Sequence, residues 1–276
     1  MARTKVLICV KTYPTLSEKY DELVCTAGLR EDGSWIRIYP VPFRKLNYSN
    51  QYSKWQWIEL DLIRNTKDLR PESFRPNLDS PITLLDKIGT ERLWAERKGL
   101  VLRDVKTNMT DLITEAKDAT KRTSLAVLKP SKIIDFVYEP CEREWDKSKL
   151  EAVKAHNDQL DLFEQEEAAA IFQVVQKIPY TFSYIFETED GIKRKLMIED
   201  WEVGMLYLSA LKSAEGDETV ALEKVREKFF NQFVEQKDLY FFLGTTLKFH
   251  NIAPNPFIII GTFYPPKSKD IEPTLF

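Results

Sequence analysis

The stretch WIRIYPVPFRKL, residues 35–46, combines aromatic, aliphatic and basic residues in an order that could hold a flat, negatively charged ligand. In an extended strand, Trp35, Arg37 and Tyr39 lie on one face and the two intervening isoleucines lie on the other. If the isoleucines face the core, the opposite face presents two aromatic rings around a guanidinium. Such a face can stack a nucleobase and pair with a phosphate, because every base has a π-face and arginine forks onto phosphate oxygens.

More basic and aromatic residues follow closely in the sequence. Arg44 and Lys45 come at the corner after the strand, and Trp55 and Trp57 follow within about a dozen residues. Basic residues interleaved with aromatic ones on a sheet are typical of proteins that grip single-stranded nucleic acid. The alternative is that the rings form a second small core with Arg37 extended between them. We therefore predict a nucleic-acid-binding surface for single-stranded or modified RNA or DNA, with core packing as the open alternative.

Loops supply further candidates for contacts to the same ligand. Arg70 and Arg75 lie on the proline-stiffened segment DLRPESFRP, where two fixed guanidinium groups could clamp a phosphate unless Asp68 and Glu72 pair with them. The secondary candidates are Lys11 and Tyr13 after the first strand, and Lys248 and His250 between the last two strands.

A rival interpretation is an enzyme that acts on nucleotides or nucleic acids. Glu199, Asp200 and Glu202 come together in MIEDWE, where carboxylates could hold Mg²⁺ for phosphodiester cleavage, and His250 could act as an acid or base. The simpler interpretation is that Asp200 caps the following helix and Glu202 complements its dipole. Mg²⁺ is expected only under this rival interpretation; otherwise we predict no cofactor and no metal site.

Complete catalytic signatures are missing from the sequence. It has no glycine-rich phosphate loop, no GxSxG and no HExxH, and its three cysteines show no CxxC spacing. Two histidines are too few for a multi-histidine metal site. The sequence therefore identifies no catalytic residue, and whether the protein is an enzyme stays open.

The elements that must position these residues are mostly antiparallel strands. Strands are expected at 4–11, 23–30, 35–40 and 55–63, which suggests an antiparallel sheet or small barrel, followed by helices near 83–98 and 108–119. The C-terminal half is expected to hold a strand at 132–140, a β-hairpin at 180–201, helices at 200–213 and 217–235, and two final strands in 238–264. The fold class is therefore α+β, with β-hairpins and two packed helices in the second half.

Charge divides the chain into two unequal halves. Residues 1–130 hold 23 Lys and Arg against 17 Asp and Glu, whereas residues 131–276 hold 17 against 26. We place a soft boundary at 130 between a basic, aromatic-rich domain and an acidic α+β domain, although one continuous domain is the alternative. The acidic half could dock a protein partner, so a subunit of a complex is a further alternative. Because no apolar run approaches the roughly 20 residues of a membrane span, we predict a cytoplasmic protein with no membrane contact.

A resemblance to a known family is carried by three segments: KTYPTLSEKYDELVCTAGLREDGSWIRIYPVPFR, DLRPESFRP and KDLYFFLGTTLKFHNIAPNPFIIIGTFYPP. They resemble an uncharacterised bacterial family of conserved hypothetical proteins, over most of the chain apart from the acidic connector at 139–167. The resemblance implies a bacterial or phage setting and brings no activity, cofactor or catalytic residue. The strand pattern is also similar to small barrels that read RNA or modified bases, such as PUA and ASCH-like domains, as an analogy of fold alone.

Overall fold

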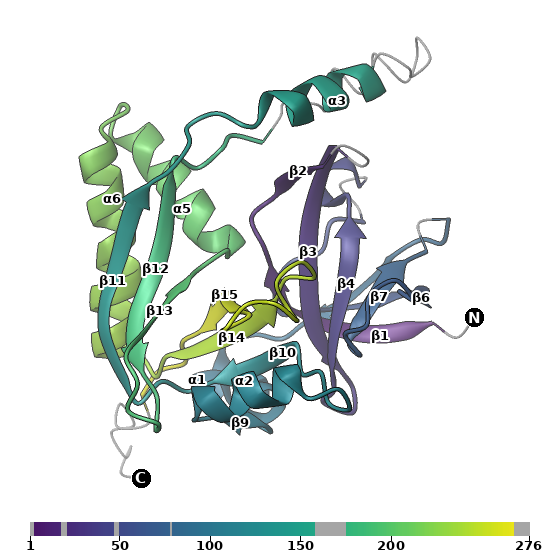
Figure 1. Cartoon of the computed structure of the whole chain (residues 1–276), viewed down its shortest axis with the longest axis horizontal. Coiled ribbons are helices and arrows are strands. Elements are labelled where there is room, and N and C mark those ends of the chain that lie inside the picture. The colour runs from purple at the N-terminus through teal and green to yellow at the C-terminus, as the bar shows by residue number, and fades with distance from the viewer. Residues whose placement is uncertain (1–2, 18–20, 47–49, 78, 158–174, 268–276) are drawn as a thin grey trace.

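The computed structural model describes residues 3–17, 21–46, 50–77, 79–157 and 175–267. These residues form five α-helices and fifteen strands, which confirms the α+β class. The described strands form three sheets, and Figure 1 shows the first and third on opposite sides of the molecule with β14 and β15 between them.

The first sheet is a curled, mostly antiparallel half-barrel in the N-terminal half, as predicted. Its strand order is β6-β7-β4-β3-β1-β5-β8, with β2 paired to β3, and β4 with β7 is its one parallel pair among the described strands. The strand β1 is buried along its five central residues, because both faces of this apolar run are covered. The strands are β1 (Thr4–Lys11), β2 (Thr15–Ser17), β3 (Asp21–Arg30), β4 (Trp35–Val41), β5 (Gln56–Leu60), β6 (Leu62–Arg64), β7 (Ser73–Pro76) and β8 (Thr83–Lys87).

The second sheet, in the order β15-β14-β10-β9, packs against one face of the first. It consists of β9 (Val105–Lys106), β10 (Leu125–Leu128), β14 (Tyr240–Thr245) and β15 (Phe257–Phe263), and the helices α1 (Glu91–Val101) and α2 (Met109–Lys117) come before and after β9 in the sequence. The side chain of Asn108 starts α2 by accepting hydrogen bonds from the backbone N–H groups of Thr110 and Asp111.

The third sheet and the C-terminal helices bury the largest aromatic core. The sheet has the order β11-β12-β13. The ring of Phe136 packs against the rings of Tyr184 and Phe229. These elements are β11 (Lys132–Pro140), β12 (Tyr180–Glu187), β13 (Arg194–Met197), α5 (Trp201–Ser213), α6 (Glu218–Arg226) and the π-helical turn Glu227–Glu235. The acidic connector contains α3 (Lys147–Asn157), and its remainder at 158–167 lies outside the described residues.

One expectation about the region between the halves differs from the structure. The helix predicted at 83–98 is wrong in its first part, because residues 83–87 form β8 on the edge of β5, where Ile58 pairs with Leu84. A free strand edge recruits this segment, and local helix propensity does not show that edge. The soft boundary at 130 stays a prediction; one sheet spans it, since β10 before it pairs with β14 after it.

A short segment after β13 ties the three sheets together. Ile198 forms a bridge with Ile259 of β15, and the N–H of Glu199 donates to the Ile259 carbonyl at 2.8 Å. The next residue, Asp200, forms a bridge with Thr12 at the end of β1. Residues 198–200 therefore fix the third sheet against the other two. Among the described helices, none combines the length and apolar character needed to cross a membrane.

Candidate functional site

A cavity of about 310 Å³ lies where the first sheet meets β14 and β15. The polar part of its wall combines Cys25, Arg37 and Tyr39 with Arg70 and Glu199. The apolar part includes Leu23, Leu247, Ile258 and Ile260. Residues far apart in the sequence thus form one concave, mixed surface, which is the usual character of a ligand site.

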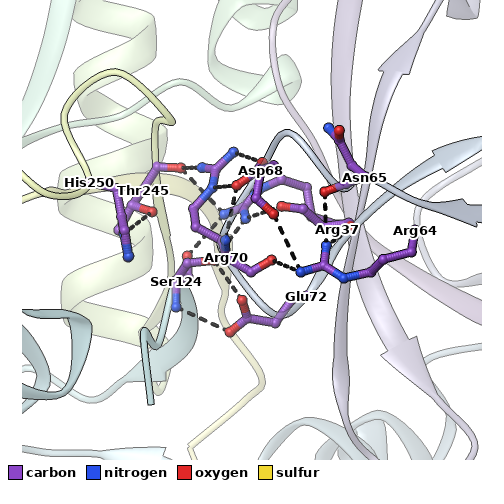
Figure 2. A network of polar contacts seen from close by, with 10 residues as sticks. Arg37, Arg64, Asn65, Asp68, Arg70, Glu72, Ser124, Thr245 and His250 are labelled. Carbon is purple, nitrogen blue, oxygen red and sulfur yellow. Dashed lines mark hydrogen bonds and ion pairs between the residues drawn. The ribbon is translucent and has the colours of Figure 1, made fainter. Parts of the chain in front are cut away.

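Arg37 is only 3% exposed and is held by four hydrogen bonds (Figure 2). Its Nη1 donates to the hydroxyls of Ser73 at 3.2 Å and Ser124 at 2.8 Å. Its Nη2 donates to the carbonyls of Ser124 at 3.0 Å and Thr245 at 3.3 Å. Burial and then the charge of Arg70 lower the pKa of Arg37, but a guanidinium stays protonated at neutral pH. The plane of Arg37 is therefore fixed by neutral acceptors.

Arg70 is the second buried guanidinium of the cavity. It binds Asp68 with two nitrogens, at 2.8 and 2.5 Å, and its Nη1 donates to the Thr245 carbonyl. Burial alone would raise the pKa of Asp68, but the hydrogen bonds and charge of Arg70 outweigh burial and lower it to about 2. The pair is therefore ionised and close to neutral overall at physiological pH.

Glu72 completes the polar network from the side of Ser124. Its carboxylate accepts from the Ser124 N–H at 3.1 Å and from the Ser124 hydroxyl at 2.8 Å. Its backbone carbonyl accepts from the N–H of Arg37 at 2.8 Å. The sequence left open whether acidic neighbours pair with Arg70 and Arg75. Asp68 pairs with Arg70, whereas Arg75 lies exposed on β7.

His250 is buried behind the cavity wall, with 1% of its surface exposed. Its Nδ1 lies 2.9 Å from the hydroxyl of Thr245, and its Nε2 is buried with no partner among the described residues. Burial, followed by the charges of Arg70 and Arg37, lowers the pKa of His250. His250 therefore anchors its loop from a buried position, and burial favours the neutral imidazole.

Glu199 and Cys25 are two further titratable groups of the cavity, and Glu199 has no counter-ion in the described part of the chain. Burial raises the pKa of Glu199. Burial also raises the pKa of the Cys25 thiol, against the opposing effect of Arg37 and Arg70. Near neutral pH, Cys25 is therefore a thiol, and Glu199 takes up a proton more readily than an ordinary carboxylate.

Of the tryptophans expected on the exposed face, Trp55 is buried, and Trp35 and Trp57 are partly buried against the core. Trp35 packs edge-on against Phe242 at 5.6 Å, Trp55 packs against Phe263 at 5.4 Å, and Trp57 packs against the same cluster. The prediction that these tryptophans face solvent is wrong, because β14 and β15 cover that face of the first sheet. Tyr39 is the exposed ring of this group, at 38%, and lies at the rim of the cavity.

The other basic and aromatic candidates lie outside the cavity. Arg44 binds Glu22 at 2.6 Å, and the side chain of Lys45 lies outside what the structure describes. Lys11 lies over the rings of Phe43 and Trp201, and burial and then the charge of Lys54 lower its pKa to about 8. The Tyr13 hydroxyl donates to the Gln176 carbonyl at 2.7 Å, and Lys248 is exposed, 5.2 Å from the Phe249 ring.

The acidic residues of MIEDWE are divided between different roles. Asp200 is fully buried and caps α5 by accepting from the Glu202 N–H at 3.1 Å, as the simpler interpretation predicted. Lys54 lies 3.3 Å from Asp200 and 3.2 Å from Glu202, where a cation would lie between two carboxylates. Within the described ranges, no group of three or more His, Cys, Asp and Glu is arranged to hold a metal ion. Of these three carboxylates, Glu199 lines the cavity of about 310 Å³.

Several residues of the network have no signal in the sequence. Ser73, Ser124 and Thr245 act through hydroxyls and carbonyls that any buried serine or threonine carries. Arg37 stands out by its aromatic neighbours, but its acceptors Ser73, Ser124 and Thr245 are 36, 87 and 208 residues away in the sequence. Arg37 and these acceptors come together only when the chain folds as a whole.

Comparisons with known proteins identify a family and no function. No curated protein matches the chain. A solved structure of a murine DNA-binding protein bound to double-stranded DNA matches over 100% of each chain, with 9% identity and a TM-score of 0.32, and a likeness this distant carries no argument. Residues 2–103 match the family model described as Domain of unknown function (DUF8758). The chain belongs to the family described as Domain of unknown function (DUF8757), whose model matches residues 105–276.

Proposed function

We propose that this protein binds nucleic acid and takes one unstacked base into the cavity beside Arg37, Tyr39 and Glu199. The observation that carries the proposal is a cavity that joins a fixed guanidinium, an aromatic ring at its rim and a carboxyl group without a counter-ion. Its volume of about 310 Å³ lies at the lower end of the range for small-molecule sites, which suits a single base better than a larger ligand.

The arginines offer flat surfaces and a few remaining donors. All four Nη hydrogens of Arg37 have acceptors within the protein, so its planar face is what it can offer to a ligand. Arg70 donates from Nε, Nη1 and Nη2, which leaves about two of its five N–H groups without an acceptor among the described residues. A base stacked on Arg37 with a polar edge near Arg70 fits these properties.

The opposite wall offers hydrogen bonds to a base edge. A protonated Glu199 carboxyl both donates and accepts, and the raised pKa favours that form. The hydroxyl of Thr246, which also lines the cavity, is buried without a partner among the described residues. These groups match the mixed donors and acceptors of a base edge and would be satisfied by one.

The phosphate backbone would lie outside the cavity, against the loops at its edge. Lys67 precedes the Asp68–Arg70 pair, and Lys248 follows the cavity residue Leu247; both lysines are exposed. Exposed lysines on two loops that meet at the Arg70–Thr245 contact would bind phosphates on either side of the base.

Binding of labelled single-stranded DNA and RNA, each with a normal and an abasic central position, tests the proposal. We expect Tyr39→Ala to weaken binding of the normal strand by about tenfold, because a stacked base contributes about 1–3 kcal/mol. We expect a smaller effect on the abasic strand. Tyr138→Ala is the matched control, since Tyr138 on β11 is 37% exposed and lies on another sheet.

Two outcomes would contradict the proposal. One is the absence of binding to any oligonucleotide at low salt. The other is equal binding by Tyr39→Ala and Tyr138→Ala. If the protein instead elutes as an oligomer with Tyr39 protected, the subunit interpretation gains support.

A second candidate function is an enzyme that acts on the bound base. The observation in its favour is Glu199, whose raised pKa and place in the cavity suit a general acid. Mass spectrometry of the same oligonucleotides after incubation tests it. Glu199→Gln is expected to stop any conversion while binding persists; oligonucleotides that the wild type leaves unchanged would argue against it.

A further inference from the structure

The loop between β14 and β15, residues 246–256, exposes an unusual group of apolar side chains. Leu247 is 54% exposed, Phe249 46% and Ile252 71%. In the described part of the chain, ten large apolar side chains are exposed, and these three fall within six residues. Grouping of this kind marks a contact surface, whereas single exposed apolar residues need no explanation.

Backbone hydrogen bonds and a buried anchor hold this loop in one shape. The N–H groups of Phe249 and His250 both donate to the Thr246 carbonyl, at 3.2 and 3.0 Å. The N–H of Ile252 donates to the Phe249 carbonyl at 3.3 Å. His250 points inward to Thr245, while its neighbours are exposed. The apolar side chains are therefore presented by a fixed turn.

The turn begins at the cavity. Thr246 and Leu247 line the cavity next to Leu23 and Cys25 of β3, and the loop leaves β14 at that point (Figure 1). Leu69, which is 58% exposed, precedes Arg70, whose side chain reaches the Thr245 carbonyl. The opening of the cavity therefore has apolar side chains on the loop that forms its edge.

We infer that residues 247–252 form a wedge that enters a nucleic-acid duplex beside the base that the cavity takes up. This inference rests on the proposed function and names its ligand as a duplex with a weakened base pair. A base that leaves a duplex creates a gap in the stack, and proteins fill such gaps with Phe, Leu or Ile side chains. Lys248, placed between two of the apolar residues and exposed, is positioned for the adjacent phosphates.

Size favours a duplex over a protein partner. A stable protein interface covers about 800 Å² on each partner, usually with 20–30 residues. A turn of six residues is small for that purpose, but one or two of its side chains suffice to separate a pair of stacked bases. The turn lies next to a cavity whose size suits one base, so the same nucleic acid could contact both.

Fluorescence of 2-aminopurine placed opposite a mismatch in a duplex tests the inference, with the same strand alone as reference. Wild type is expected to increase the fluorescence of the duplex, because the probe leaves the stack. Phe249→Ala with Ile252→Ser is expected to remove that increase and weaken duplex binding by about tenfold, while single-strand binding stays within about twofold. Ile252→Ser alone is a second variant, and its exposure of 71% makes a folding defect improbable. Ile192→Ser is the control, since Ile192 is 50% exposed and lies on the turn between β12 and β13.

The outcomes separate the wedge from the proposed function. Intact duplex binding and fluorescence in the loop variants, with single-strand binding also intact, would overturn the wedge alone. Equal loss of single-strand and duplex binding would also overturn it, because the loop would then be a general strand contact. If wild type binds no single strand at low salt, the proposed function itself fails.

Discussion

Arg70 donates a hydrogen bond to the backbone carbonyl of Thr245, a residue 175 positions later in the chain. The same carbonyl accepts from Arg37, which is also in the N-terminal half. One acceptor in the region matched by the second family model thus holds two buried guanidinium groups of the first. The cavity is a property of the complete chain, because neither half supplies this arrangement alone.

Removal of the Arg37 side chain is expected to affect stability before any binding. Arg37→Met removes the donor to the buried hydroxyls of Ser73 and Ser124, whereas the Thr245 carbonyl keeps Arg70 as a donor. We expect the free energy of unfolding to fall by about 2–3 kcal/mol, because buried acceptors are left unsatisfied. Urea denaturation measures it, and Arg75→Met, at an exposed arginine of β7, is the control with a change of about 0.5 kcal/mol or less. Similar losses for both variants would show that the network around Arg37 contributes little.

The buried carboxyl of Asp200 is expected to make stability depend on pH. Burial raises its pKa from 3.8 to about 6 in the folded protein, despite the neighbouring Lys54. The folded state therefore retains a proton that the unfolded chain releases, and this contribution to stability is lost as the pH rises from about 4 to about 6. Asp200→Asn lacks that proton exchange.

Denaturation of wild type and Asp200→Asn at several pH values measures this contribution. The difference in unfolding free energy, wild type minus variant, should fall between pH 4 and 6 and remain level above pH 7. A difference that rises over that interval would mean that the attraction of Lys54 outweighs burial and lowers the pKa instead.

Two glycines are expected to respond in opposite ways to alanine. A Cβ at Gly28 would lie 2.1 Å from the Leu7 carbonyl oxygen of β1, so Gly28→Ala should destabilise the protein by about 3 kcal/mol. A Cβ at Gly99 in α1 meets no described atom within 4 Å, so Gly99→Ala should stabilise it by about 0.5–1 kcal/mol. Thermal unfolding followed by circular dichroism gives both values. A stable Gly28→Ala variant would mean that β1 and β3 can separate without loss of the sheet.

The exposed lysines of the two loops are expected to control the salt dependence of binding. Each phosphate contact that is lost should reduce the slope of log K against log salt by about 0.7–0.9. Lys67→Gln and Lys248→Gln should each lower the slope by that amount and leave the preference for a normal over an abasic strand unchanged. Lys212→Gln, on the last turn of α5, is the control and should leave the slope as it is. Unchanged slopes in all three variants would place the backbone elsewhere.

Local sequence patterns predicted most of the elements. The apolar run in β1, the hairpin of β3 and β4 and the three- and four-residue spacing after residue 217 each depend on neighbours in the chain. The helix expected at 83–98 failed at its start because the partner of β8 is β5, and strand pairing is a property of the sheet.

The site was predictable only in part, for the same reason. Alternation placed Arg37 and Tyr39 on one face, and both line the cavity. Alternation could not show that Phe242 and Phe263 cover the neighbouring tryptophans, because those rings come from strands about 200 residues later. The sequence suggested Glu199 as a metal ligand together with Asp200 and Glu202. In the structure Glu199 lines the cavity and the other two do not, because the chain turns from strand to helix between them.

Residues 198–200 contact segments of the first and second sheets while following directly after the third. Their partners Ile259, Thr12 and Lys54 belong to segments that are distant in sequence, and the closing of such long loops costs chain entropy before the contacts are made. We expect this segment to join the native structure after the rate-limiting step of folding. Changes there would then speed unfolding and leave the folding rate nearly constant. The lifetime of the native fold, more than the speed of its formation, would depend on these three residues.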